Sequence, residues 1–188
     1  MSKLTLLALA LTVTAAGCGD DPVSYSAPVS LNLKIKSDDV ANGVAVDEKG
    51  ITTESGNPWG AFISDAEAQV GGAPGDIDLD ELTLLLGATS LNVTELRAMF
   101  DGTVDVQFQM NDSDNIYPVG TALIDDELEG REAGFDILFD YADFAGDDLT
   151  RLLGGSFKVL LGGPADAGFA NLSGDADLQV TLLFSAYE

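Results

Sequence analysis

The chain has 188 residues, with 32 Asp and Glu against 8 Lys and Arg, and its formal net charge is −24. One cysteine and no histidine exclude a disulfide within the chain, a Cys/His zinc site, and Ser-His-Asp or Cys-His catalysis. The acidic excess repels nucleic-acid phosphates, so no nucleic-acid partner is expected.

The N-terminus has the pattern of an export signal. Lys3 supplies a positive charge, and an apolar run of ten residues follows at Leu4–Val13. Ten residues at helical rise cover only about half of a bilayer core, which predicts a signal peptide rather than a membrane-spanning helix. Small residues then lead to the only cysteine in the order Ala15-Ala16-Gly17-Cys18.

This arrangement resembles the lipobox of bacterial lipoproteins. The resemblance implies cleavage between Gly17 and Cys18 and lipidation of the Cys18 thiol. It covers about the first eighteen residues, and Ala15 stands where the family usually carries an aliphatic residue. Gly19 follows the cysteine where Asp would favour the inner membrane, so the resemblance implies an outer-membrane location. The alternative is ordinary secretory cleavage after Ala16, which leaves Cys18 as a free thiol.

The rest of the chain predicts one domain behind a tether. Cleavage of residues 1–17 leaves 171 residues with a net charge of −25, because Lys3 is lost. Residues 18–28 contain two prolines and no apolar periodicity, so we expect a lipidated flexible tether. The domain is expected over residues 29–188, and it opens with a strand in which every second residue is apolar as far as Lys36.

The next segments are less regular. Turn signals predict that residues 37–58 are mostly loop. Residues 59–70 are expected to hold one or two short strands. Residues 77–86 predict a strand whose leucine-rich second half is buried on both faces.

Two short helices are predicted. Residues 91–100 begin with a capping pattern in which Asn92 is the N-cap and Glu95 completes a capping box. Residues 147–153 begin with two aspartates and are followed by Gly154, which favours a helix of one or two turns.

Alternating strands dominate the second half of the chain. The polar turn Asn111–Asn115 indicates a hairpin, and Pro118 favours a strand edge or end for its second arm. Residues 125–134 are expected to form a charged loop or short helix. The last strand has the longest alternation and is predicted to pair inside a sheet. The strands expected here cover residues 103–110, 116–124, 135–141, 156–161 and 177–186.

Together these elements predict an all-β fold. Seven to nine strands with glycine turns and one or two short helices favour a single antiparallel β-sandwich, Ig-like or jelly-roll-like. A partly closed β-barrel is the alternative.

Carboxylates supply the candidate metal sites. Asp76, Asp78 and Asp80 are best interpreted as a solvated strand face, because same-face neighbours lie about 6.5–7 Å apart, too far to share one calcium ion. The Asn111–Asn115 turn is a better candidate. Asp112 and Asp114 lie within it, and Asp125 or Asp126 could complete a calcium site from elsewhere, although Asx turns explain the same residues without a metal.

No catalytic residue is predicted, because the sequence contains no recognisable hydrolase motif. Trp59 could stack on a sugar ring, but a single tryptophan beside a turn more often caps a core.

The sequence therefore predicts a non-enzymatic envelope lipoprotein with a structural or binding domain. Its expected partners are the membrane, through the lipid anchor, and an envelope protein or glycan. No cofactor is required. One alternative is a calcium-dependent carbohydrate- or ligand-binding module that uses Asp112, Asp114 and Trp59. The other is a carboxylate-dependent hydrolase.

Overall fold

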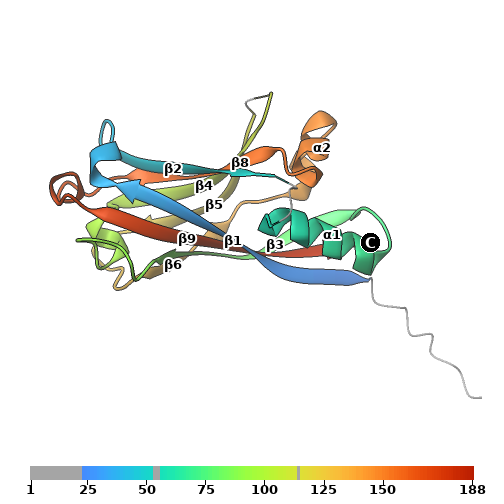
Figure 1. Ribbon diagram of the computed structural model, residues 1–188, viewed down its shortest axis with the longest axis horizontal. Helices are drawn as coiled ribbons and strands as arrows, with labels where there is room; N and C mark the ends of the chain where they lie inside the picture. The colour runs from blue at the N-terminus through green and yellow to red at the C-terminus, as the bar shows by residue number, and fades with distance from the viewer. Residues whose placement is uncertain (1–22, 53–55, 114) are drawn as a thin grey trace, which may run out of the picture.

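The computed structural model describes residues 23–52, 56–113 and 115–188, which form two antiparallel sheets packed face to face (Figure 1). One sheet has the strand order β1-β9-β3-β6 and the other β2-β8-β4-β5-β7. This arrangement confirms the predicted single β-sandwich, and no closed barrel forms among the described residues. The strands are β1 (Ser24–Lys36), β2 (Val44–Ile51), β3 (Asp76–Leu86), β4 (Gly102–Met110), β5 (Ile116–Ile124), β6 (Glu132–Gly134), β7 (Asp136–Ile137), β8 (Phe157–Pro164) and β9 (Asp175–Tyr187).

Helices are short and few in the described chain. The two α-helices are α1 (Pro58–Val70) and α2 (Asp147–Leu153), and the 3₁₀ turns are η1 (Ser37–Asp39), η2 (Leu96–Ala98), η3 (Tyr141–Asp143) and η4 (Phe169–Asn171). Neither α-helix is long and apolar enough to cross a membrane.

Period-two burial builds the core between the sheets. Each buried aliphatic or aromatic side chain contributes about 1.5–3 kcal/mol, so a regular alternation fixes which face of each strand turns inward. β9 pairs with β1 on one side and β3 on the other, which confirms the prediction that the last strand lies inside a sheet. The buried residues of β9 and β4 include Ala176, Leu178, Val180, Leu182, Phe184, Val104, Val106, Phe108 and Met110.

A bulge keeps the alternation of β3 in phase. The register against β9 shifts between Leu79 and Glu81, so Asp80 and Glu81 both face solvent. Burial on both faces of the leucine-rich half was the wrong prediction. Leu85 is 39% exposed on the outer face, whereas the leucines on either side of it are buried.

The sheet edges are short or covered, as soluble β proteins require. β6 and β7 have three and two residues. α1 packs against the edge strand β1, with the rings of Tyr25 and Phe62 5.9 Å apart. The edge strand β2 approaches β1 from the other sheet, where the Asp47 carboxylate accepts a 2.8 Å hydrogen bond from the Lys34 backbone N–H.

The domain starts earlier than predicted, so a tether reaching residue 28 is too long. Ser24–Pro28 belong to β1 because they pair with Leu183–Tyr187 of β9. Pro28 is tolerated there because β1 is an edge strand, which leaves one side of its backbone without a ladder partner. Gly17 and Cys18 lie outside the described residues.

The strands predicted over residues 59–70 are wrong, because this segment is α1. The Asn57 side chain caps the helix by accepting a 2.9 Å hydrogen bond from the Trp59 backbone N–H, and Pro58 is its first residue. Gly71 ends the helix in the left-handed conformation, with φ of 85°. These are ordinary helix signals, since proline favours the first turn and glycine the C-terminus.

Two other segments differ from expectation. The loop predicted over residues 37–58 contains β2, which pairs with β8. The helix predicted over residues 91–100 is reduced to η2. Asn92 adopts φ of 59°, and its side chain donates to the backbone carbonyls of Leu172 and Ser173, so it does not cap a helix.

The later elements follow the prediction more closely. The hairpin of β4 and β5 is confirmed, and α2 has the predicted bounds. The loop predicted at residues 125–134 includes the short β6. The strand predicted over residues 135–141 is mostly wrong, because only β7 is extended and paired before the chain turns into η3, where the Asp140 side chain accepts from the Ala142 backbone N–H.

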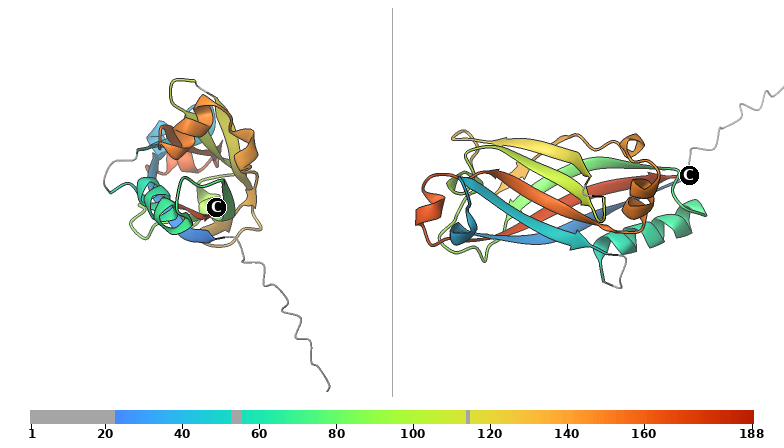
Figure 2. Two further views of the ribbon diagram at one scale, coloured as in Figure 1. Left: turned by 90° about the vertical axis from the view of Figure 1, so that its right-hand side faces the viewer. Right: turned by 90° about the horizontal axis from the view of Figure 1, so that it is seen from above.

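The long strands give the sandwich two distinct ends (Figure 2). What we call the N-terminal end holds the start of β1, the start of β3 and the C-terminus, together with α1 and α2. The far end holds the opposite ends of the same strands, at Lys36, Leu86 and Asp175.

Trp59 closes the core at the N-terminal end. Its side chain is 1% exposed, and its ring lies 5.1 Å from Phe184 of one sheet and 5.4 Å from Phe157 of the other. The indole N–H donates a 2.9 Å hydrogen bond to the Leu152 carbonyl of α2. The buried ring therefore offers no stacking face to a sugar, and the structure supports the core-capping alternative.

Replacing Trp59 should be costly. We expect Trp59→Ala to lower the free energy of unfolding by about 3–5 kcal/mol, because it opens a cavity between both sheets and two helices. Urea denaturation followed by far-UV circular dichroism measures the change. Leu123→Ala is the control and should change stability by less than about 0.5 kcal/mol, since Leu123 is 64% exposed. Equal midpoints for the two variants would contradict the proposed role of Trp59.

Candidate functional site

A hollow lies on the outer face of the four-stranded sheet, near its far end. It has a volume of about 470 Å³. We call it the far-end groove. Polar side chains from β1 and β9 and the loop after β3 lie around the exposed Leu85 side chain. The lining residues are Asn32, Leu33, Lys34, Leu85, Gly87, Thr89, Asp177, Leu178 and Gln179.

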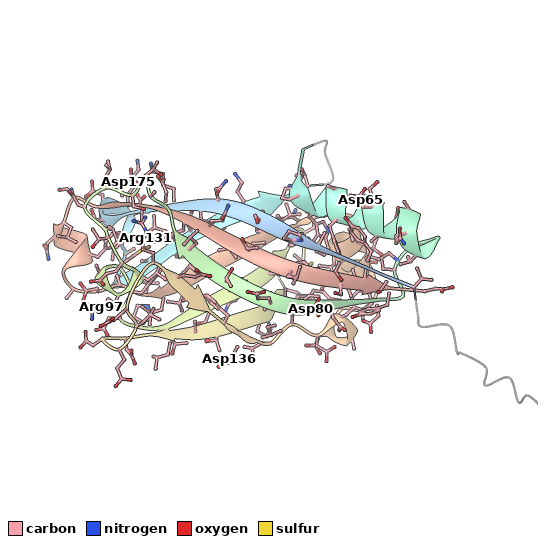
Figure 3. All side chains as sticks on the ribbon, turned by 90° about the horizontal axis from the view of Figure 1, so that it is seen from below. Asp65, Asp80, Arg97, Arg131, Asp136 and Asp175 are labelled. Carbon is pink, nitrogen blue, oxygen red and sulfur yellow. The ribbon has the colours of Figure 1, made fainter. Side chains whose placement is uncertain are left out.

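Strand register brings these side chains together. Asn32 lies opposite Gln179 and Lys34 opposite Asp177 in the β1–β9 ladder. Gln179 also lies opposite Leu85 in the β3–β9 ladder. Because residues two apart point to the same face, the outward positions of three adjacent strands form neighbouring rungs. Figure 3 views the molecule from below, with Asp175 and Arg131 labelled near the far end and Asp80 nearer the N-terminal end.

The groove contains one cation paired with two carboxylates. The Lys34 ammonium nitrogen lies 2.9 Å from a carboxylate oxygen of Asp175 and 3.5 Å from one of Asp177. The hydrogen bond to Asp175 is the main cause that raises the pKa of Lys34. The hydrogen bond from the Thr89 hydroxyl is the main cause that lowers the pKa of Asp177, and attraction to Lys34 acts in the same direction. The pair is therefore ionised at neutral pH.

Backbone contacts hold the loop that forms one wall of the groove. The Gly87 N–H donates a 2.7 Å hydrogen bond to the Asp177 carbonyl, and the Ser90 hydroxyl donates to the Gly87 carbonyl at 2.8 Å. The Arg131 guanidinium donates to the carbonyls of Leu86 and Gly87. This bonding fixes Thr89 beside Asp177, so the fold itself sets the shape of the groove.

The candidate calcium site at the Asn111–Asn115 turn falls only partly within the described residues. Asp114 lies outside the described residues, and Asp112 is exposed in the left-handed conformation, with φ of 66°. Asp125 and Asp126 follow the last residue of β5, whereas the turn precedes its first residue. Nine strand residues separate the two positions by about 30 Å, so Asp125 and Asp126 cannot complete this site.

The described part of the turn contacts Asp148 instead, which sequence reasoning placed only at a helix start. Asp148 is 6% exposed. Its carboxylate accepts hydrogen bonds from Ser113, Asn115 and Tyr117 at 2.6–3.0 Å, and Arg151 lies 2.7 Å away. Hydrogen bonding from Asn115, followed by Tyr117 and the others, outweighs burial and lowers the pKa of Asp148 to about 2. This network ties α2 to the β4–β5 hairpin.

Asp76, Asp78 and Asp80 lie on an outward-facing strand, as expected. The Ser185 hydroxyl donates to Asp80. Burial, followed by the charges of Asp76, Asp80 and Asp140, raises the pKa of Asp78. In the described ranges, no group of three or more His, Cys, Asp or Glu residues is arranged to hold a metal ion.

A scan against protein-family models and a search of curated proteins find no match to this chain. The far-end groove was missed by sequence reasoning. Its only signal is the set of polar outward positions on the first and last strands, and their meeting depends on strand register.

Neutralising Asp148 should make the stability of the fold less sensitive to acid. Because its pKa is lowered from 3.8 to about 2, its charge stabilises the fold fully above about pH 4, and this stabilisation is lost as the pH falls toward 2. We expect Asp148→Asn to be less stable at neutral pH and to lose less stability between pH 4 and 2. Urea denaturation across that range measures both effects.

Asp112→Asn is the matched control, because Asp112 is exposed on the neighbouring turn and Asn accepts its left-handed conformation. It should retain the wild-type dependence on pH. If Asp148→Asn lost as much stability as the wild type between pH 4 and 2, the stabilising role of the Asp148 charge would be contradicted.

Proposed function

We propose that the protein is a lipid-anchored, non-enzymatic binding module of the bacterial cell envelope. Cys18 holds it at the outer membrane, and the far-end groove holds its ligand. The observation that carries this proposal is the position of the groove, at the opposite end of the sandwich from Val23, the first described residue.

Chain length supports close attachment of the N-terminal end. Only four residues separate Cys18 from Val23, whose carbonyl accepts a hydrogen bond from the Glu188 backbone N–H. Five Cα–Cα steps cover at most about 18 Å. A lipid on Cys18 would therefore keep the start of β1 near the headgroups.

Strand length and charge support presentation of the groove away from the membrane. Lys34 follows Ser24 by ten residues in β1, which is about 33 Å along the strand. The net charge of −25 that remains after cleavage opposes flat adsorption to anionic headgroups. An upright sandwich would then expose the groove to the surrounding compartment.

The groove chemistry favours binding over catalysis. Among the described groove residues, the ionisable side chains are Lys34 and Asp177, and each is engaged by the other. Thr89 also bonds Asp177, which keeps this carboxylate ionised rather than poised near neutral pH. The remaining polar groups donate and accept hydrogen bonds, which suits recognition of a neutral ligand.

Replacing Cys18 should abolish lipidation. Cells grown with radiolabelled palmitate should label the wild-type protein but not Cys18→Ala, and the variant should leave the membrane fraction. Asp21→Ala changes a nearby residue while retaining the cysteine, so it should be labelled like the wild type. Label persisting in Cys18→Ala would refute the anchor. A wild-type protein that carries no label and reacts with maleimide would favour the free-thiol alternative.

A further inference from the structure

A second hollow lies next to the far-end groove on the same sheet. This smaller hollow, of about 140 Å³, lies on the same outer face and is lined by Pro28, Glu81, Thr83, Thr181 and Leu183. Thr181 is two residues from Gln179 in β9, so the two hollows occupy neighbouring rungs. We call the two hollows together the track. From Asp177 to Leu183 it extends about 20 Å along β9.

The middle of the track is uncharged, which is unusual in so acidic a chain. One rung consists of Ser30, Thr181 and Thr83, and the Ser30 and Thr181 hydroxyl oxygens are 3.1 Å apart. The next rung places Asn32 beside Gln179. Hydroxyl and amide groups both donate and accept hydrogen bonds, so the track matches a ligand whose own groups do the same.

Apolar side chains accompany these polar rungs. Leu85 is exposed within the groove, and Pro28 lies opposite Leu183 in the smaller hollow. A sugar ring matches both kinds of side chain. Its hydroxyl groups form hydrogen bonds, and its C–H faces make apolar contacts. Along the outer face of β9, a chain of such rings would meet polar side chains at Gln179 and Thr181. It would meet apolar ones at Leu183 and, on the neighbouring strand β3, at Leu85.

The backbone pairing disfavours a peptide strand. β9 is bonded to β1 on one side and β3 on the other, so its N–H and C=O groups are used within the sheet. A peptide that adds to a sheet needs an unpaired edge. A ligand lying on the face of β9 must therefore be recognised by side chains alone.

Charge disfavours an anionic ligand. Lys34 is the only cationic residue among those lining the track, and two carboxylates already neutralise it. Glu81 adds a negative charge at the other end of the track, and the whole chain is strongly acidic. Uronic acids or phosphorylated chains would be repelled.

We propose that the track binds a neutral oligosaccharide chain lying along β9. This inference rests on the proposed function as a binding module and names the ligand class. Recognition comes from the hydroxyl and amide rungs, and Leu85 and Leu183 contact the sugar rings.

The test uses the purified mature protein in detergent on an array of neutral oligosaccharides, from monosaccharides to hexasaccharides, with uronic-acid chains of the same lengths. We expect binding to a neutral series that tightens with chain length and then levels off once the track is filled. Gln179→Ala and Thr181→Val should each weaken binding about five- to tenfold, the effect of losing one or two hydrogen bonds.

Gln109→Ala is the matched control, because Gln109 is a half-buried outward residue on β4 of the other sheet. It should bind like the wild type, and all three variants should retain the wild-type melting temperature within a few degrees. Preference for uronic-acid chains, or glycan binding that Gln179→Ala leaves intact, would overturn the assignment.

If no glycan on the array bound, the proposal of an oligosaccharide ligand would also be overturned. A separate experiment tests whether the protein is a binding module at all. Solubilised envelope components are captured on the wild-type protein and on Gln179→Arg. Capture of a non-glycan component that Gln179→Arg abolishes would leave the proposed function in place. Equal capture by both proteins would remove the groove from that function as well.

Discussion

The two-sided pairing of β9 is the constraint on which the rest of the structure depends. Thirteen residues of β9 match thirteen of β1, and the other side of the strand pairs along nearly all of β3. Once this register is set, the alternation of β9 decides what is buried and what is displayed. Leu178 and Val180 enter the core, and Gln179 between them must face outward. The groove is thus a consequence of the same ladder that forms the core.

The acidic composition is tolerated because the core, rather than ion pairing, holds the sandwich together. Exposed ion pairs such as Lys158 with Glu48 contribute at most about 1 kcal/mol. Repulsion is visible where carboxylates crowd, since the charges of Asp76 and Asp80 help to raise the pKa of Asp78. Asp148 shows the opposite arrangement, in which donors converge on one carboxylate and keep it charged. Charged side chains therefore adjust local contacts near the ends of the sandwich, while apolar burial determines the fold.

Local patterns predicted the long strands, such as β4 and β9, because apolar and polar residues alternate along consecutive positions. They also located α2 through the two aspartates of its first turn and the glycine that ends it. α1 was missed because its apolar content suggested strands, although Asn57, Pro58 and Gly71 marked a helix. The candidate site was beyond such reasoning. Lys34 and Asp177 are far apart in the sequence, near the two ends of the domain. No local pattern indicates that they lie opposite each other in neighbouring strands.

The same ladder links the proposed anchor to the proposed ligand. β1 begins just after the chain that leads from Cys18, and its outward residues Asn32 and Lys34 line the groove near its other end. A pull on a ligand held by β9 would be directed along the strands. The hydrogen bonds between β1 and β9 would then be loaded together in shear, instead of being opened one at a time from an end. A central strand that both displays the groove and pairs with the anchored strand suits a module that must hold its ligand while tied to a membrane.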